Sequence, residues 1–181
     1  MKKITNLKSV RPIYKAALLI AVLSVAATAG TLLLTPGFGV TANNVVARAS
    51  FIDPTDIKIK VNDGKEEVLH MPNAEETVVH QIKLAPGGYT GWHSHPGPVI
   101  VLVKSGALTF YDAEFPGCPA THTYTAGQSF VDAGQGHVHN AKNTSSEELE
   151  LWAVYLDVPP GGVFRNDIPA ADVPAGCSII P

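Results

Sequence analysis

The chain has 181 residues, and 45% of them are hydrophobic, so the sequence can form a packed core and is unlike that of a disordered protein. From Ser50 onward it has 7 basic and 16 acidic side chains, which gives a net charge of −9. A domain with this charge lacks the basic surface that binding to nucleic acid or to anionic lipid requires.

The chain begins with a basic segment that is followed by an apolar one. Five Lys or Arg side chains precede Ala16, and residues 16–47 contain no charge. The most apolar part, residues 16–34, is 19 residues long, which is enough for a helix that crosses a hydrocarbon core. The positive flank predicts that the N-terminus is cytoplasmic and that the following domain is exported.

Residues 1–49 are therefore interpreted as a hydrophobic signal or anchor helix with its flanks, and residues 50–181 as a single domain. The leader is either a signal peptide, cleaved within residues 40–42 or 47–49, or an uncleaved membrane anchor through residues 16–34. In both cases the expected location is extracytoplasmic: secreted, periplasmic or membrane-anchored and facing outward.

Many short segments after Ser50 have the pattern of β-strands. Turn-forming residues separate them, and no segment shows a sustained helical period. The run VIVLV at residues 99–103 is continuously apolar, which is typical of a strand buried on both faces. The sequence therefore predicts an all-β sandwich or barrel, with strands near residues 56–61, 77–84, 99–103, 107–111, 121–125, 128–131, 137–143 and 149–156.

The two cysteines, Cys118 and Cys177, have no neighbouring cysteine at the spacing of a metal site. In an oxidising compartment such a pair is most simply explained by one disulfide, which would tie the C-terminal tail to the domain.

Four of the seven histidines lie in two His-x-His pairs, His93 with His95 and His137 with His139. Residues i and i+2 of a strand point to the same side, so each pair can project into one cavity. Imidazole is a ligand that suits zinc, copper, iron and nickel. The two pairs therefore predict a metal site.

Both pairs lie in segments that resemble the motifs of the cupin family. Residues 87–106 resemble the first motif, G-x5-H-x-H-x(3,4)-E-x6-G, and residues 127–143 resemble the second, G-x5-P-x-G-x2-H-x3-N, with one extra residue. The resemblance covers residues 57–158. It implies a cupin double-stranded β-helix, which is a jelly-roll barrel, and a homodimer formed by sheet contact.

The resemblance also implies a divalent transition metal (Fe, Mn, Ni, Cu or Zn) on His93, His95 and His139. The position of the family's glutamate ligand holds Val99, and Gly134 replaces the proline of the second motif. A site without that carboxylate carries more positive charge and favours anionic ligands. His137 is a candidate for an additional ligand or a base, and Asp132 and Gln135 are further donors near the loop.

Two functions remain open at this point. One is a small exported metalloenzyme, an oxygenase, isomerase or lyase that acts on a small molecule. The other is a non-catalytic cupin that has lost its metal and binds a small ligand. Trp92, Tyr111 and Trp152 are candidates for lining the pocket, although aromatic side chains on barrel strands more often belong to the core.

Overall fold

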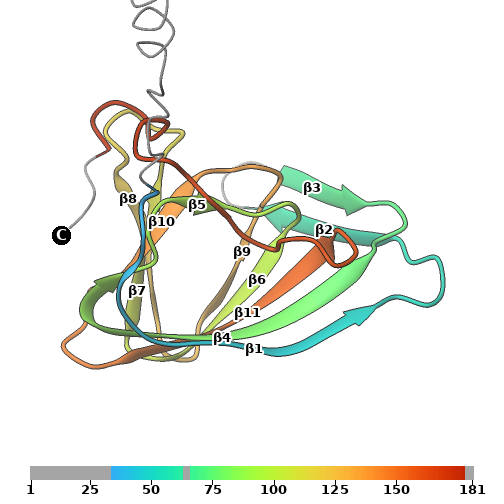
Figure 1. Ribbon diagram of the computed structural model, residues 1–181, viewed down its shortest axis with the longest axis horizontal. Coiled ribbons are helices and arrows are strands. Elements are labelled where there is room, and N and C mark those ends of the chain that lie inside the picture. The colour runs from blue at the N-terminus through green and yellow to red at the C-terminus, as the bar shows by residue number, and fades with distance from the viewer. Residues whose placement is uncertain (1–33, 63–65, 178–181) are drawn as a thin grey trace, which may run out of the picture. The chain divides into compact units, whose positions relative to one another are not determined.

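The computed structural model describes residues 34–62 and 66–177, which lie in one compact unit of the chain (Figure 1). These residues contain strands and no helix. The strands are β1 (Phe38–Ser50), β2 (Ile57–Asn62), β3 (Glu66–Met71), β4 (Glu76–Tyr89), β5 (His93–Ser94), β6 (Val99–Ser105), β7 (Ala107–Asp112), β8 (Ala120–Thr125), β9 (Ser129–Asp132), β10 (His139–Asn143), β11 (Leu149–Val158) and β12 (Asn166–Asp167).

The predicted all-β class is confirmed, and every strand expected after residue 50 is present. The predicted helix of residues 16–34 lies, except for Leu34, outside the described residues and stays a prediction. Within residues 34–62 and 66–177, no helix is long and apolar enough to cross a membrane.

The main sheet folds into two halves that are joined by the long strand β4. One half has the strand order β1-β4-β11-β6-β9, and the other has β8-β7-β10-β5-β12. The end of β4 joins them, because Tyr89 pairs with Lys142 of β10. All of these pairings are antiparallel, and together they make a nearly closed barrel of the jelly-roll type.

The core lies between the two halves. Alternate residues of β6 (Val99, Val101 and Val103) are buried in it, together with side chains from β4, β7, β10 and β11. Leu102 is 43% exposed, so the expectation that residues 99–103 are buried on both faces is wrong at this position. Ile100 also faces outward but is covered, because it packs with Met71.

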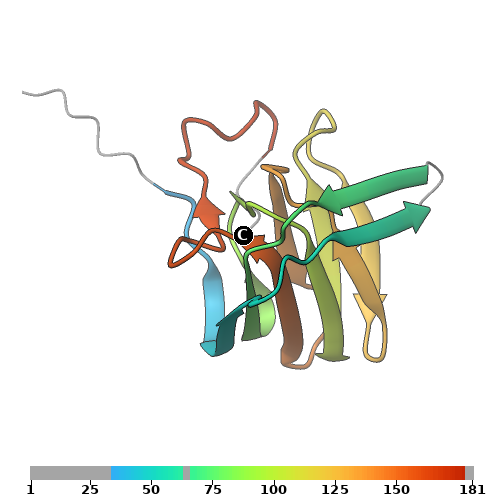
Figure 2. The ribbon, with the colours of Figure 1, turned by 90° about the vertical axis from the view of Figure 1, so that its right-hand side faces the viewer.

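The hairpin of β2 and β3 forms a separate two-stranded sheet that crosses the outside of the main sheet (Figure 2). Its Ile57, Ile59 and Met71 side chains pack against Ile100 and Leu156. The hairpin therefore explains why the outer face of β6 is apolar at Ile100.

Strand β1 lies in the segment that the sequence analysis assigned to the leader, and no strand was expected there. It pairs along most of β4, from Phe38 opposite Tyr89 to Ser50 opposite Glu76. Nearly all of its side chains are exposed, so it lacks the alternating pattern that marks a half-buried strand. Where the leader ends remains a prediction.

Candidate metal centre

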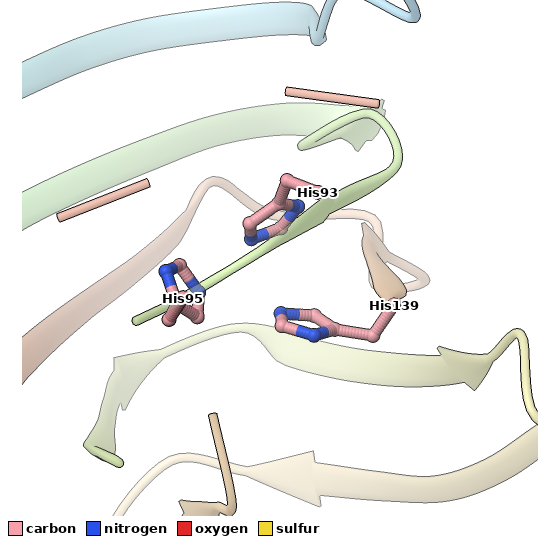
Figure 3. Close-up of side chains that lie close together, drawn as sticks. All are labelled: His93, His95 and His139. Atoms are coloured by element: carbon pink, nitrogen blue, oxygen red, sulfur yellow. The ribbon is translucent and has the colours of Figure 1, made fainter. Parts of the chain in front are cut away.

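Three histidines from two strands and one loop meet inside the barrel (Figure 3). His93 belongs to β5, His95 follows this strand directly, and His139 opens β10 opposite His93. Their ring centroids are 4.3 Å (His93–His139), 4.8 Å (His93–His95) and 5.1 Å (His95–His139) apart. The three residues are between 3% and 5% exposed. The structure thus brings together the histidines that the two motifs predict.

The outer nitrogen of each ring is held by a backbone carbonyl. Nδ1 lies 2.8 Å from the Gly91 oxygen in His93, 2.8 Å from the Phe164 oxygen in His95, and 3.3 Å from the His137 oxygen in His139. A carbonyl oxygen only accepts hydrogen bonds, so each Nδ1 must carry the proton. In a neutral ring the lone pair is then on Nε2, which is the arrangement of a metal-binding histidine.

Burial keeps these three rings uncharged. Loss of hydration lowers the pKa of His95 to about 4, with a further contribution from the neighbouring His139. The same effects hold the pKa of His93 well below its usual value. Burial also lowers the pKa of His139, although Asp132 opposes the shift. At neutral pH no proton therefore has to leave Nε2 of any of the three rings before a cation binds there.

The histidines line a cavity of about 40 Å³, which has room for an ion and roughly one to a few water molecules. Its other walls are mostly apolar side chains, among them Phe110, Phe130 and Tyr155. The ring of Phe110 stacks on His139 at a centroid distance of 4.8 Å. Burial raises the pKa of the Tyr155 hydroxyl, so this hydroxyl is neutral in the cavity. These apolar and aromatic walls thus position the imidazoles without adding charge of their own.

One carboxylate also reaches this cavity. Asp132, the last residue of β9, has a side chain that is 2% exposed. Its Oδ2 atom lies 3.5 Å from Nε2 of His139 and 3.7 Å from Nε2 of His95. Its Oδ1 atom accepts hydrogen bonds from Gly134 N at 3.2 Å and His137 Nδ1 at 3.4 Å.

His137 lies between two carboxylates, apart from the three-histidine group. Its Nε2 is 2.9 Å from Oδ1 of Asp112, and its Nδ1 is 3.4 Å from Oδ1 of Asp132. The hydrogen bond to Asp132, together with the weaker effect of Asp112, raises the pKa of His137 to about 9, although burial opposes this shift. His137 is therefore an imidazolium at neutral pH, which can donate protons but cannot serve as a base or a ligand in that state.

The same imidazolium helps to keep Asp132 ionised. Burial raises the pKa of this carboxyl, but electrostatic interactions with His139 and His95, which act when those rings are protonated at low pH, and the hydrogen bond from His137 lower it to about 2. His139 and His95 are themselves uncharged at neutral pH, so His137 supplies the positive charge that matters there.

A larger cavity of about 530 Å³ opens beside the small one and shares Phe110, Phe130 and Asp132 with it. Its acidic lining consists of Glu67, Asp112, Glu114 and Asp132. This lining does not favour the anionic ligands that the absence of a glutamate at position 99 suggested.

The three aromatic residues that were predicted to line the pocket do not line either of these cavities. Trp92 is fully buried beside the two cysteines, Tyr111 packs against the same cluster, and Nε1 of Trp152 donates to Glu150. Each of them is next in sequence to a residue that does face the small cavity: His93, Phe110, and Leu151 with Ala153. Because side chains of a strand alternate between its faces, the rings of Tyr111 and Trp152 point away from the cavity, and Trp92, which precedes β5, is buried in its own cluster.

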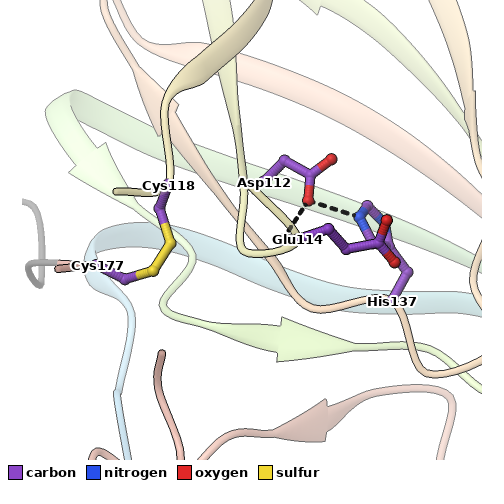
Figure 4. The surroundings of a disulfide bond; sticks show 5 residues. All are labelled: Asp112, Glu114, Cys118, His137 and Cys177. Atoms are coloured by element: carbon purple, nitrogen blue, oxygen red, sulfur yellow. Dashed lines mark hydrogen bonds and ion pairs between the residues drawn. A yellow bond between two sulfur atoms is a disulfide. The ribbon is translucent and has the colours of Figure 1, made fainter. Parts of the chain in front are cut away.

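Cys118 and Cys177 form a disulfide with their Cα atoms 5.1 Å apart, as the sequence predicted. Figure 4 shows it near the loop that carries Asp112 and Glu114, the neighbours of His137. The backbone N of Glu114 donates to Oδ1 of Asp112 at 2.8 Å, and this is the oxygen that also accepts from His137.

A family model described as Cupin domain matches residues 80–159, which include the three histidines and Asp132. No curated protein matches the chain. One similar solved structure is a cupin domain from Bordetella pertussis Tohama I, at 24% identity and TM-score 0.39, covering 59% of this chain and 97% of that one.

Another is an uncharacterized conserved protein with a double-stranded β-helix domain from Klebsiella pneumoniae, at 22% identity and TM-score 0.41, covering 68% of this chain and 85% of that one. An oxalate oxidase in complex with glycolate is similar at 23% identity and TM-score 0.39, over 45% of this chain and 41% of the oxidase. Residues 80–159 thus match the cupin domain model and lie in a barrel of the jelly-roll type, which supports a cupin domain in this part of the chain.

Proposed function

We propose that this protein is an exported cupin that binds one divalent transition metal (Fe, Mn, Ni, Cu or Zn) and acts on a small molecule. The metal would be held by Nε2 of His93, His95 and His139. The observation that carries this proposal is the proton arrangement: each Nδ1 donates to a backbone carbonyl, so three Nε2 lone pairs converge in one buried cavity.

When bound, such a metal supplies a Lewis acid or an oxygen-binding centre, as oxygenase, isomerase and lyase reactions require. The chain's own residues would do the rest. The small cavity excludes bulk water from the histidines, and the larger cavity beside it offers a place for the substrate. The imidazolium of His137 lies at the boundary between the two and holds a proton on Nδ1, facing Asp132.

The disulfide supports the exported location, because disulfides form and persist outside the reducing cytoplasm. The uncharged segment that follows the basic N-terminus points the same way.

The test is the metal content of the full chain, purified from its exported fraction without a histidine tag or chelator. We expect close to one equivalent of a transition metal by elemental analysis. His93→Ala and His139→Ala should each lose the ion and the thermal stability that the ion adds. Full metal content in both variants would show that the metal is held elsewhere.

A second function is favoured by the distance of 3.5 Å between His139 Nε2 and Asp132 Oδ2. A second proton on His139, carried by Nε2, would make the ring an imidazolium and satisfy both atoms without any metal, and the barrel would then be a small-ligand-binding cupin. In that case the purified protein contains no metal and takes up none when Mn²⁺ or Zn²⁺ is added.

A further inference from the structure

Val99 of β6 stands at the position where the first motif has its glutamate, and a carboxylate of β9 lies directly opposite it. Val99 pairs with Asp132 in the antiparallel register of these two strands. Side chains of directly opposed residues point to the same face of a sheet. Both residues accordingly line the small cavity with the three histidines, and Val99 contributes only methyl groups to it.

The two oxygens of Asp132 have different surroundings. Oδ1 accepts from the backbone N of Gly134 and from Nδ1 of His137. Oδ2 is buried and has no hydrogen-bond partner, although it lies 3.5 Å from one imidazole nitrogen and 3.7 Å from another. A buried oxygen without a partner is rare in folded proteins, and a charged one is costly.

The imidazoles do not supply the missing partner. In His95 and His139 the proton is on Nδ1, so Nε2 presents a lone pair to Oδ2. The lone pairs of His95 and His139 therefore face Oδ2 of Asp132 with no hydrogen between them, and His93 belongs to the same three-histidine group. Because lone pairs repel one another in a medium of low dielectric constant, this arrangement calls for a cation at its centre.

We propose that Asp132 is a fourth protein ligand of the metal, so that β9 supplies the carboxylate that β6 lacks. This inference rests on the proposed function and deepens it. Three neutral imidazoles and one carboxylate reduce the charge of a divalent ion from +2 to +1. With the acidic lining of the adjacent cavity, such a site favours a neutral or cationic substrate over an anionic one.

His137 positions this ligand. Its Nδ1 donates to Oδ1 of Asp132, and its Nε2 is held by Asp112, so the carboxylate is oriented with Oδ2 facing the histidines. The hydrogen bond from Gly134 N to the same Oδ1 holds the carboxylate from a second side and so limits its rotation. Outer-sphere hydrogen bonds of this kind orient metal-binding carboxylates in general.

The test compares Asp132→Asn with Asp112→Asn. Each variant removes one negative charge beside His137, but only the first changes the proposed ligand. The affinity for Zn²⁺ and for Mn²⁺ is measured by competition with a chelator, on the full chain. We expect Asp132→Asn to weaken binding by at least about 10-fold more than Asp112→Asn does, since even outer-sphere partners cost that much.

The melting temperature of the metal-free protein provides a second readout. An asparagine at position 132 could keep Oδ1 toward His137 and Gly134 while its Nδ2 donates to the Nε2 lone pairs. Both variants weaken an ion pair with His137, so we expect metal-free Asp132→Asn to melt no lower than metal-free Asp112→Asn. An ion pair between Asp132 and a protonated His139 would instead make Asp132→Asn the less stable of the two variants.

Zn²⁺ and Mn²⁺ affinities of Asp132→Asn within about 2-fold of those of Asp112→Asn would overturn this proposal, and so would a melting temperature of metal-free Asp132→Asn below that of metal-free Asp112→Asn. If the wild type itself binds neither ion, the proposed function fails as well. If the wild type binds and the His93→Ala variant does not, the three-histidine site stands, whatever the result at Asp132.

Discussion

At the scale of single residues, the candidate site depends on protons in fixed places. Three Nδ1 protons are held by the carbonyls of Gly91, His137 and Phe164, and two protons on His137 are held by two carboxylates. The carbonyls belong to three separate segments of the chain. Because backbone positions define the tautomers, most side-chain substitutions elsewhere should leave the histidines ready to bind a metal.

The charge on His137 predicts how the stability of the metal-free protein changes with pH. The pKa of His137 in the folded protein is about 9, against about 6.5 in an unfolded chain. A raised pKa contributes stability that is complete below pH ~6.5 and disappears as the pH rises through about 9. We expect the free energy of unfolding to fall by up to about 3 kcal/mol across this range. Urea denaturation at several pH values, in the presence of a chelator, measures it.

The matched control is His137→Gln, which keeps a hydrogen-bond donor and removes the titrating ring. Its free energy of unfolding should be lower than that of the wild type at pH 6.5 and should not show this decline. Parallel curves for the two proteins would show that another group is responsible for the pH dependence.

At the scale of elements, the loop between β9 and β10 has a sharp steric requirement at Gly134. This residue has φ +64°, and a β-carbon on it would lie 1.9 Å from the carbonyl oxygen of Gly97. The same loop is tied to the first motif, because Gly136 N donates to the His95 oxygen at 3.0 Å. The replacement of the family's proline by Gly134 thus permits a close contact between the loops that carry the histidines.

We expect Gly134→Ala to lower the free energy of unfolding by about 2 kcal/mol or more and to weaken metal binding, because the loop must move. Gly127→Ala is the control: its φ is +84°, but nothing lies within 4 Å of the added β-carbon. It should cost only the backbone strain, about 1 kcal/mol. Equal losses in the two variants, measured by chemical denaturation, would exclude a steric role for Gly134.

Strand β1 leads to a prediction about where the folded domain begins. Its pairing covers the edge of β4, and the side chain of Thr35 before it donates to the carbonyls of Trp92 and Ile168. A chain that starts at Ser50 would leave the edge of β4 open to other chains. Compared with a chain that starts at residue 32, we expect it to lose at least about 2 kcal/mol, or roughly 4–8 °C in melting temperature, and to associate. Calorimetry and light scattering measure these effects, and equal behaviour would show that β1 is dispensable.

Strands with a clear pattern could be predicted from the sequence, and those without one could not. Residues 57–62 alternate between polar and apolar side chains, and residues 99–103 are all apolar, with Ile100 on the outer face covered by a hairpin. Strand β1 has no such pattern, since its side chains are exposed on both faces. Motif spacing was enough to find His93, His95 and His139.

The sequence alone could show only that Asp132 lies near the loop of the second motif, and not that its side chain enters the small cavity. Its role depends on the β6–β9 register, which sets it opposite Val99, and a register is a property of the folded sheet. By contrast, the orientation of Tyr111 and Trp152 can be predicted from the sequence. The alternation of side chains along a strand separates these two from their cavity-facing neighbours, whereas Trp92 precedes β5 and its place depends on the fold.

At the scale of the whole molecule, the disulfide ties the C-terminal tail to the loop between β7 and β8. Cys118 lies between β7 and β8, and Cys177 lies near the end of the tail, 59 residues later. The chain-entropy estimate for closing a loop of this length is about 4 kcal/mol. The buried cluster of Trp92 and the two cysteines would lose its connection to the tail without it.

We therefore expect reduction to lower the melting temperature of the wild type. The control is Cys118→Ser/Cys177→Ser, which should melt near the reduced wild type and be insensitive to reductant. Two free thiols in protein taken from the exported fraction would contradict the disulfide and, with it, part of the case for export.

The convergence of the proposed ligands would also determine when the protein could acquire a metal. The unfolded chain presents His93 and His95 close together, but His139 reaches them only when β10 pairs with β5, and Asp132 only when β9 pairs with β6. An ion bound there would therefore be selected after folding, in the compartment where folding is completed. Since histidine sites in general prefer copper and zinc over manganese and iron, the supply of ions in that compartment would decide which metal the protein carries.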